Sequence, residues 1–127
     1  MGADNIGRAQ VQLIRWDSIA AKKMNDTTTL QAVWGEKATL ARFCFKKGAH
    51  VPTHRHEAEQ HSYLLKGNME MRVDGRSLTL LQGDVLIIPS YVEHEASFHE
   101  DSVVVDFFSP ARTDWARGEY AYLRGKV

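Results

Sequence analysis

The sequence predicts an all-β fold of a single domain, either a sandwich or a barrel. Short segments in which apolar and polar residues alternate recur along the chain, and glycines or an Asp-Gly pair separate them. Segments with helical spacing are scarce. Many short strands at regular spacing, with few helices, are typical of these two architectures. A length of 127 residues suits one domain with a buried core, and no repeat or linker divides the chain.

The first third of the chain contains two segments that we expect to be strands. Residues 11–16 form the first, and they are apolar on both faces. Such a strand suits packing against a second subunit or strand exchange, so we expect a homodimer. Residues 39–46 form the second strand, which ends at Gly48. Residues 16–25 are ambiguous and could contain one helical turn.

The remainder of the chain contains five further segments with strand character. They are residues 62–66, 69–73, 77–81, 85–89 and 103–108. Asp74-Gly75 separates the second from the third and predicts a hairpin turn, because both central positions of such a turn need a positive φ. The fourth is a continuous apolar run, which predicts a strand buried on both faces.

Two structures are compatible with the C-terminal tail. Asp114 could cap a short helix that contains Trp115, Tyr120 and Leu123. The same tail could instead be an extended segment that packs on the barrel.

Composition excludes some classes of protein. The chain has 16 basic and 16 acidic residues, whereas a nucleic-acid-binding protein usually has a basic excess. No apolar run approaches the length of a membrane span, and the first ten residues lack the apolar core of a signal peptide. Cys44 is the single cysteine, so no internal disulfide can form, and its apolar neighbours predict a buried, inert thiol. We therefore expect a cytoplasmic protein.

Two of the six histidines have a spacing that suggests a metal site. His54 and His56 are two residues apart, so on a strand their imidazoles project from the same face. Converging imidazoles are what a metal ion requires. The alternative is a pair of solvent-exposed loop histidines that follow Pro52.

The residues around these histidines resemble the two sequence motifs of the cupin superfamily. The matching segments are Gly48-x5-His54-x-His56-x3-Gln60-x6-Gly67 and Gly83-x5-Pro89-x4-His94. The resemblance implies a jelly-roll β-barrel over about residues 38–110, with the N-terminal strand and the C-terminal tail packing on it in one domain that covers residues 1–127. It also implies one divalent metal ion held by three histidines and the residue at position 60.

Three positions depart from the general cupin pattern. Tyr91 and Phe98 replace a glycine and an asparagine, and neither position is a ligand. Gln60 replaces the usual glutamate, so an ion held by His54, His56, His94 and Gln60 keeps its full charge of +2. Compared with a site that has a glutamate ligand, such a site attracts an anionic oxygen ligand more strongly and stabilises trivalent iron less well. This favours Lewis-acid over redox chemistry. These ligands suit Zn, Ni, Mn and Fe alike. His61 is a rival ligand on the opposite strand face, and His50 and His99 match neither motif.

A second cluster of polar residues lies near the C-terminus. Asp106 and Phe108 share one face of a predicted strand, whereas the opposite face is wholly apolar and should pack against neighbouring elements. The face of Asp106 can then point into the cavity that contains the metal. A buried aspartate needs a partner, and Arg112 could fold back to the cavity mouth. The alternative is an ion pair between Asp106 and Arg112 that only stabilises the fold, or an aspartate on the surface.

The segment Asp106-Phe107-Phe108-Ser109-Pro110-Ala111-Arg112-x-Asp114 resembles the C-terminal signature of the KdgF-type cupins. That family converts 4,5-unsaturated monouronates to linear ketone forms. The resemblance implies that His54, His56, His94 and Gln60 hold the metal and that Asp106, Phe108 and Arg112 are catalytic. In such a reaction Asp106 would move a proton, Arg112 would grip the substrate carboxylate, and Phe108 would supply an apolar wall. Two alternatives remain, a ferrous dioxygenase and a non-catalytic cupin that binds a metal or a sugar.

Overall fold

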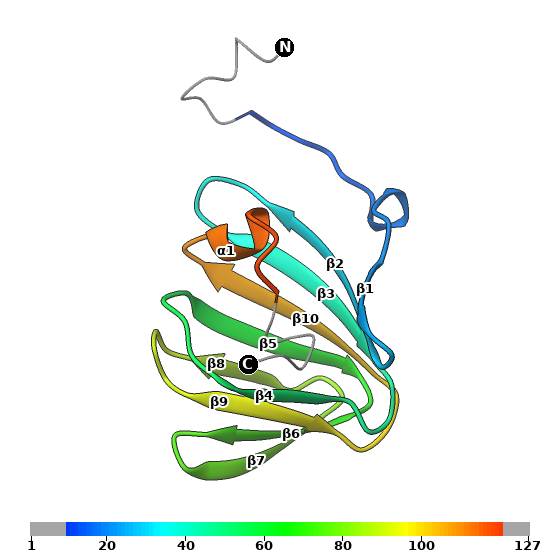
Figure 1. The fold of residues 1–127 in the computed structure, drawn as a ribbon, viewed down its shortest axis with the longest axis vertical. Helices are drawn as coiled ribbons and strands as arrows, with labels where there is room; N and C mark the ends of the chain where they lie inside the picture. Colours follow the sequence, from blue (N-terminus) through cyan, green and yellow to red (C-terminus); the bar gives the residue numbers. More distant parts are fainter. Residues whose placement is uncertain (1–9, 121–127) are drawn as a thin grey trace.

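The computed structural model describes residues 10–120, which form two antiparallel β-sheets that face each other (Figure 1). The six-stranded sheet contains, in spatial order, β1 (Lys22–Asn25), β2 (Thr28–Trp34), β3 (Thr39–Phe45), β10 (Ser102–Ser109), β5 (Glu59–Lys66) and β8 (Val85–Ile88). The four-stranded sheet contains β4 (His50–His54), β9 (His94–Phe98), β6 (Asn68–Val73) and β7 (Arg76–Leu81). All neighbouring strands pair antiparallel. This arrangement confirms the predicted all-β class and the jelly-roll architecture.

Apolar side chains from both sheets fill the space between them. Phe45 of β3 stacks on Phe98 of β9, with ring centroids 3.9 Å apart. Leu64 of β5 is fully buried, and Met69 and Met71 of β6 are almost so. These residues alternate with outward-facing ones along their strands, so period-two patterning places the core between the sheets.

Two tight connections depend on glycine. The β6–β7 hairpin closes through Asp74 and Gly75, with φ of 50° and 76°, which confirms the predicted turn. Gly67, between β5 and β6, has a φ of 104°. A Cβ atom there would overlap the side chain of Ser102 and lie 2.7 Å from the carbonyl oxygen of Asp101. Only glycine therefore allows the two sheets to connect at this point without a shift of the backbone.

The prediction of a first strand at residues 11–16 is wrong. The segment is an extended arm with no strand partner among the described residues, and it leads into a 3-10 turn at Trp16–Ser18. Val11 is 103% exposed and Leu13 is 81% exposed. A strand needs a neighbour for its backbone groups, and the barrel offers none at this position. The ambiguous segment that follows contains the 3-10 turn and then β1.

Burial was predicted wrongly for two apolar segments. Cys44 is exposed, because Phe43 and Phe45 point into the core and the residue between them must face outward. Val85 and Ile87 of β8 are 58% and 57% exposed. Strand β8 lies at the edge of the six-stranded sheet, and nothing among the described residues covers its outward face.

The two faces of β10 point as the alternation predicts, but the apolar face is not packed as expected. Asp106 points inward and is buried. Val103 and Val105 point outward and are half-buried, and Phe107 is 38% exposed. The outward face of β10 therefore has no covering layer within the described residues.

The tail contains a shorter helix than predicted. Helix α1 covers Thr113–Ala116 and includes Trp115, whereas Tyr120 lies beyond its end and Leu123 lies outside the described residues. Asp114 lies inside the helix, and no side-chain hydrogen bond caps it, so the predicted capping role is wrong. No helix within residues 10–120 is long and apolar enough to cross a membrane.

Candidate metal centre and active site

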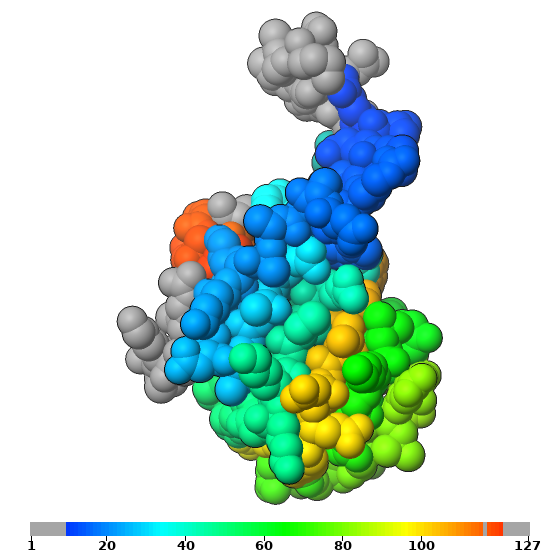
Figure 2. Space-filling view, turned by 90° about the vertical axis from the view of Figure 1, so that its right-hand side faces the viewer, coloured from blue at the N-terminus to red at the C-terminus, as the bar shows by residue number. Residues whose placement is uncertain are grey.

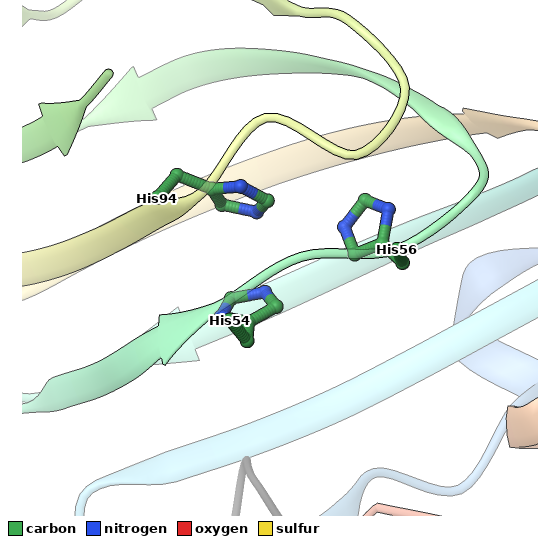
Figure 3. Close-up of side chains that lie close together, drawn as sticks. All are labelled: His54, His56 and His94. Carbon is green, nitrogen blue, oxygen red and sulfur yellow. The ribbon is translucent and has the colours of Figure 1, made fainter.

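Three histidines converge at one end of the barrel (Figure 3). His54 ends β4, His94 begins β9, and the two face each other in the register of the four-stranded sheet. His56 lies in the loop that follows β4. Each histidine offers one ring nitrogen, and these three atoms lie within 4.8 Å of one another. The predicted histidine cluster is thus assembled by two neighbouring strands and one loop.

The backbone fixes which nitrogen each ring presents. The Nδ1 atoms of His54, His56 and His94 donate to the carbonyl oxygens of Pro52, Ala58 and Val92 at 2.8, 2.9 and 2.8 Å, respectively. A carbonyl oxygen can only accept, so each Nδ1 carries the proton and the lone pair of each ring lies on Nε2. The Nε2 of His94 is buried and has no hydrogen-bond partner among the described residues. This is the arrangement by which metal-binding histidines are oriented.

All three imidazoles are neutral near pH 7. Burial is the main cause that lowers the pKa of His54 to about 3, and the neighbouring His94 lowers it further. Burial also lowers the pKa of His56 to about 4, with a contribution from the charge of Arg112. The pKa of His94 is lowered by burial as well. Neutral imidazole is the form that binds a metal ion.

Gln60 presents its amide oxygen to the histidines. Its Nε2 donates to the hydroxyl of Ser62 at 2.9 Å, which leaves Oε1 facing the Nε2 of His56 at 3.1 Å. A neutral His56 has one proton, and the backbone carbonyl already accepts it. Two lone-pair-bearing atoms therefore face each other, and a cation bound by both would stabilise this arrangement. Three ring nitrogens and one amide oxygen fit a divalent metal ion.

The other histidines point away from this cluster. His61 faces outward, and its Nε2 lies 2.7 Å from the carboxylate of Glu59. His50 and His99 are exposed, and each contacts a surface glutamate. The geometry therefore favours Gln60 over His61 as the fourth ligand.

Asp106 of β10 lies opposite Ser62 of β5, lines the same cavity as Gln60 and is 6% exposed. Its Oδ1 has no hydrogen-bond partner among the described residues. Burial raises the pKa of the Asp106 carboxyl to about 7, although hydrogen bonding by Ser62 and Gln60 and the charge of Arg112 act in the opposite direction. A carboxyl group with this pKa can both accept and donate a proton near neutral pH.

Arg112 does not form an ion pair with Asp106. Its Nε and Nη2 instead donate to the two carboxylate oxygens of Asp114, at 2.9 and 2.7 Å. The guanidinium carbon lies 4.9 Å from the centre of the Phe108 ring and 4.4 Å from that of Trp115. Phe108 also contacts His56 edge to face, at 5.6 Å. The arginine is thus fixed beside the histidine cluster by two aromatic rings and one carboxylate.

The cavity has a polar end and an apolar end. The polar end is lined by His54, Gln60, His94 and Asp106. Apolar side chains line the rest, namely Phe43, Phe45, Val51, Met69, Met71, Ala96, Phe98, Phe108 and Trp115. A second recess, lined by His56, Glu57, Ala58 and residues 110–114, lies next to Arg112.

Trp115 is the site residue that the sequence analysis missed. The sequence placed it only in the C-terminal tail, as part of a short helix or of an extended segment, although it is 2% exposed, lines the cavity and stacks on Arg112. Its spacing of three residues from Arg112 was the available signal, because guanidinium groups favour aromatic faces.

Comparisons with known proteins agree with the fold and the resemblance. The family model described as "Cupin domain" matches residues 41–109. The chain is 30% identical over 84 residues to the pectin degradation protein KdgF of Dickeya dadantii (strain 3937). The aligned residues make up 65% of this chain and 76% of that protein. An RmlC-like cupin from Shewanella frigidimarina superposes with a TM-score of 0.79 and 26% identity, over 84% of this chain and 97% of that one. KdgF from Halomonas sp. superposes with a TM-score of 0.77 and 27% identity, over 82% of this chain and 99% of that one. The chain therefore belongs to the cupin family and is a relative of KdgF.

Proposed function

We propose that this cupin converts a 4,5-unsaturated monouronate to its linear keto form with the help of one divalent metal ion. The observation that carries the proposal is Asp106, a buried carboxyl with a pKa of about 7 that lines the same cavity as His54 and His94, two of the three neutral imidazoles. Arg112 beside this cavity offers a positive charge to a substrate carboxylate. The relatives named KdgF support the substrate class.

The reaction is an isomerisation and needs no oxidant or reductant. The anomeric hydroxyl loses a proton and becomes an aldehyde while the bond between C1 and the ring oxygen breaks. The electron pair of that bond stays on the ring oxygen, which gives an enolate at C5. A proton then adds to C4 and C5 becomes a ketone. The net change is the transfer of one proton from oxygen to carbon.

The chain supplies groups for this transfer. Asp106 takes the proton from the hydroxyl and returns it to C4, because its pKa permits both steps near pH 7. Arg112 binds the substrate carboxylate, and Phe108 provides a flat apolar wall against the ring. His54, His56, His94 and Gln60 would hold the metal ion, which as a Lewis acid supplies stabilisation of negative charge on substrate oxygen.

Ultraviolet absorbance tests the proposal, because the enol ether of a 4,5-unsaturated uronate is conjugated with its carboxylate and absorbs, whereas the ketone product does not. We expect the purified protein to accelerate the loss of this absorbance. Asp106→Asn should lower kcat by about 10²–10⁴-fold, the range typical of general acid–base groups, while the metal content stays the same. Asp26→Asn, at a side chain that is 98% exposed, is the matched control. An active Asp106→Asn protein would refute the role of this carboxyl. Oxygen consumption without loss of the ultraviolet absorbance would instead support a dioxygenase.

Elemental analysis tests the metal site separately. His94→Ala removes a buried ligand from the cluster and should empty the site, whereas Gln60→Ala should only weaken it, because an amide oxygen is a weaker ligand than an imidazole. His99→Ala, at an exposed histidine outside the cluster, should leave the metal content unchanged. Full metal content in the His94→Ala protein would contradict the assignment.

A further inference from the structure

Ser62 of β5 is a polar residue at a position where the core would accept an apolar one. Its exposed fraction is 0%, and the same holds for Leu64, the next residue on that face of the strand. Strand β5 lies beside β10 in the six-stranded sheet, as the adjacent green and orange bands of Figure 2 show. A buried hydroxyl destabilises a core unless it is hydrogen-bonded, so packing alone does not explain a serine here.

Ser62 has two polar neighbours on the inward face of these two strands. Gln60 precedes it by two residues, so both side chains project from the same face of β5. On the neighbouring strand, Asp106 lies directly opposite Ser62. Side chains at such positions lie close enough to contact each other. Ser62 is therefore placed next to both the candidate amide ligand and the buried carboxyl.

The amide group of Gln60 can occupy its site in two ways. A half-turn exchanges its oxygen and its NH₂ group, which have nearly the same size. Only the oxygen can bind a cation, because the NH₂ group is a donor. A glutamine ligand therefore has to be held in one of the two orientations. A glutamate ligand has no such requirement, because both of its ends are oxygen.

The hydrogen bonds around Ser62 select the orientation in which the oxygen faces the histidines. The Nε2 of Gln60 donates to the Oγ of Ser62 at 2.9 Å. The Asp106 carboxyl is hydrogen-bonded by both Ser62 and Gln60. An ionised carboxyl only accepts, so the hydroxyl proton of Ser62 is donated to Asp106 and the hydroxyl oxygen accepts from Gln60. The reversed amide would direct its oxygen at these two acceptors, which is repulsive.

We propose that Ser62 is a positioning residue that turns the amide oxygen of Gln60 toward the three histidines. This oxygen lies 3.1 Å from the Nε2 of His56, so one cation can be shared by both atoms. Because the orientation is set before an ion binds, binding requires no rearrangement of the amide. The proposal rests on the metal site of the proposed function, but on neither the substrate nor the reaction.

Titration of the metal-free protein with Co²⁺ tests the proposal, because the visible absorbance of this ion depends on the number and type of its ligands. The titration is done at pH 8, where the Asp106 carboxyl is ionised. Ser62→Ala should raise the dissociation constant of Co²⁺ by about tenfold, the lower end of the usual effect of removing a group that orients a ligand. The visible spectrum should also shift, because the amide oxygen is no longer held toward the ion.

Ser77→Ala is the matched control. The hydroxyl of Ser77 also donates to a side chain, that of Glu70 at 2.9 Å, but it is exposed in the four-stranded sheet. Its dissociation constant and spectrum should equal those of the wild type. Circular dichroism should show that both variants are folded.

A change at the ligand separates orientation from packing. Gln60→Glu gives the ligand two oxygens, so Ser62 no longer has to select one end. In the Gln60→Glu protein, Ser62→Ala should therefore change the dissociation constant by no more than about twofold, so the two changes are not additive. An equal loss in both backgrounds, or a Ser62→Ala protein that binds Co²⁺ as tightly as the wild type, would overturn this proposal and leave the metal site intact. A wild type that binds no Co²⁺ would overturn both.

Discussion

The ion pair between Asp114 and Arg112 should contribute more to stability than a typical surface pair. The guanidinium side chain is 4% exposed and the Asp114 side chain is 33% exposed. Removal of one partner of a fully buried pair costs about 3–5 kcal/mol, and exposed pairs contribute about 0–1 kcal/mol. Because Asp114 is partly screened by water, we expect Asp114→Ala to lower the free energy of unfolding by about 2 kcal/mol. For a chain of this size that corresponds to a decrease in Tm of roughly 6–10 °C.

The pH dependence of this effect has a definite sign. Burial by itself would raise the pKa of Asp114, but the hydrogen bonds and the charge of Arg112 outweigh it and hold the pKa below its ordinary value of 3.8. A lowered pKa in the folded state stabilises the protein above the unfolded-state pKa, and this stabilisation is lost as the pH falls through the folded-state pKa. The difference between wild type and Asp114→Ala should therefore be constant from pH 5 to 8 and shrink below about pH 4.

Thermal unfolding followed by circular dichroism measures both effects. Glu119→Ala is the matched control, because Glu119 accepts two hydrogen bonds from Arg117 with the same two-residue spacing but is 58% exposed. We expect little change in Tm for this control. An equal loss in both variants, or a loss in Asp114→Ala that persists undiminished at pH 3, would refute the electrostatic reasoning.

Two further variants test how the site is supported. Gly67→Ala combines an unfavourable positive φ with an overlap against the backbone of Asp101, so urea unfolding should show that the free energy of unfolding falls by about 3 kcal/mol or more. Gly48→Ala is the control, because its φ of 89° is also positive but the space around it is open, so it should lose only about 1 kcal/mol. Trp115→Leu removes an aromatic face from Arg112, so the KM for the uronate should rise several-fold while kcat changes less. An unchanged KM would show that Trp115 does not hold the arginine in place.

Inward-facing positions could be predicted from the sequence because alternation and motif spacing determine them. Asp106 alternates with outward-facing valines, so the geometry of a strand directs it toward the cavity. His54 ends β4 beyond a shift of register and His56 lies in the loop that follows, so motif spacing rather than alternation indicates these two. Outward-facing positions could not be predicted in the same way. Cys44 and Ile87 are as apolar as core residues, and their burial depends on whether another layer covers the sheet.

Tyr91 shows a different limit of prediction. The cupin motif has a glycine at this position, and the sequence alone does not tell whether a tyrosine keeps the glycine conformation. The structure keeps a positive φ of 63° at Tyr91, and its N–H donates to the carbonyl oxygen of His56 at 2.8 Å. The loop therefore retains the left-handed conformation despite a steric cost of about 1 kcal/mol. The hydrogen bond to the segment that contains a predicted ligand offsets part of this cost.

The candidate ligands come from both sheets, and this has a consequence for the whole barrel. His54 and His94 belong to the four-stranded sheet, whereas Gln60 belongs to the six-stranded sheet. An ion shared by these residues would link the two layers at the open end, where no strand pairing joins β4 to β5. Metal binding would then raise the free energy of unfolding of the barrel, and this increase would grow with the logarithm of the ratio of metal concentration to dissociation constant. Amide hydrogens in the loop between β4 and β5 should exchange more slowly when metal is added, whereas those of the β6–β7 hairpin should not change.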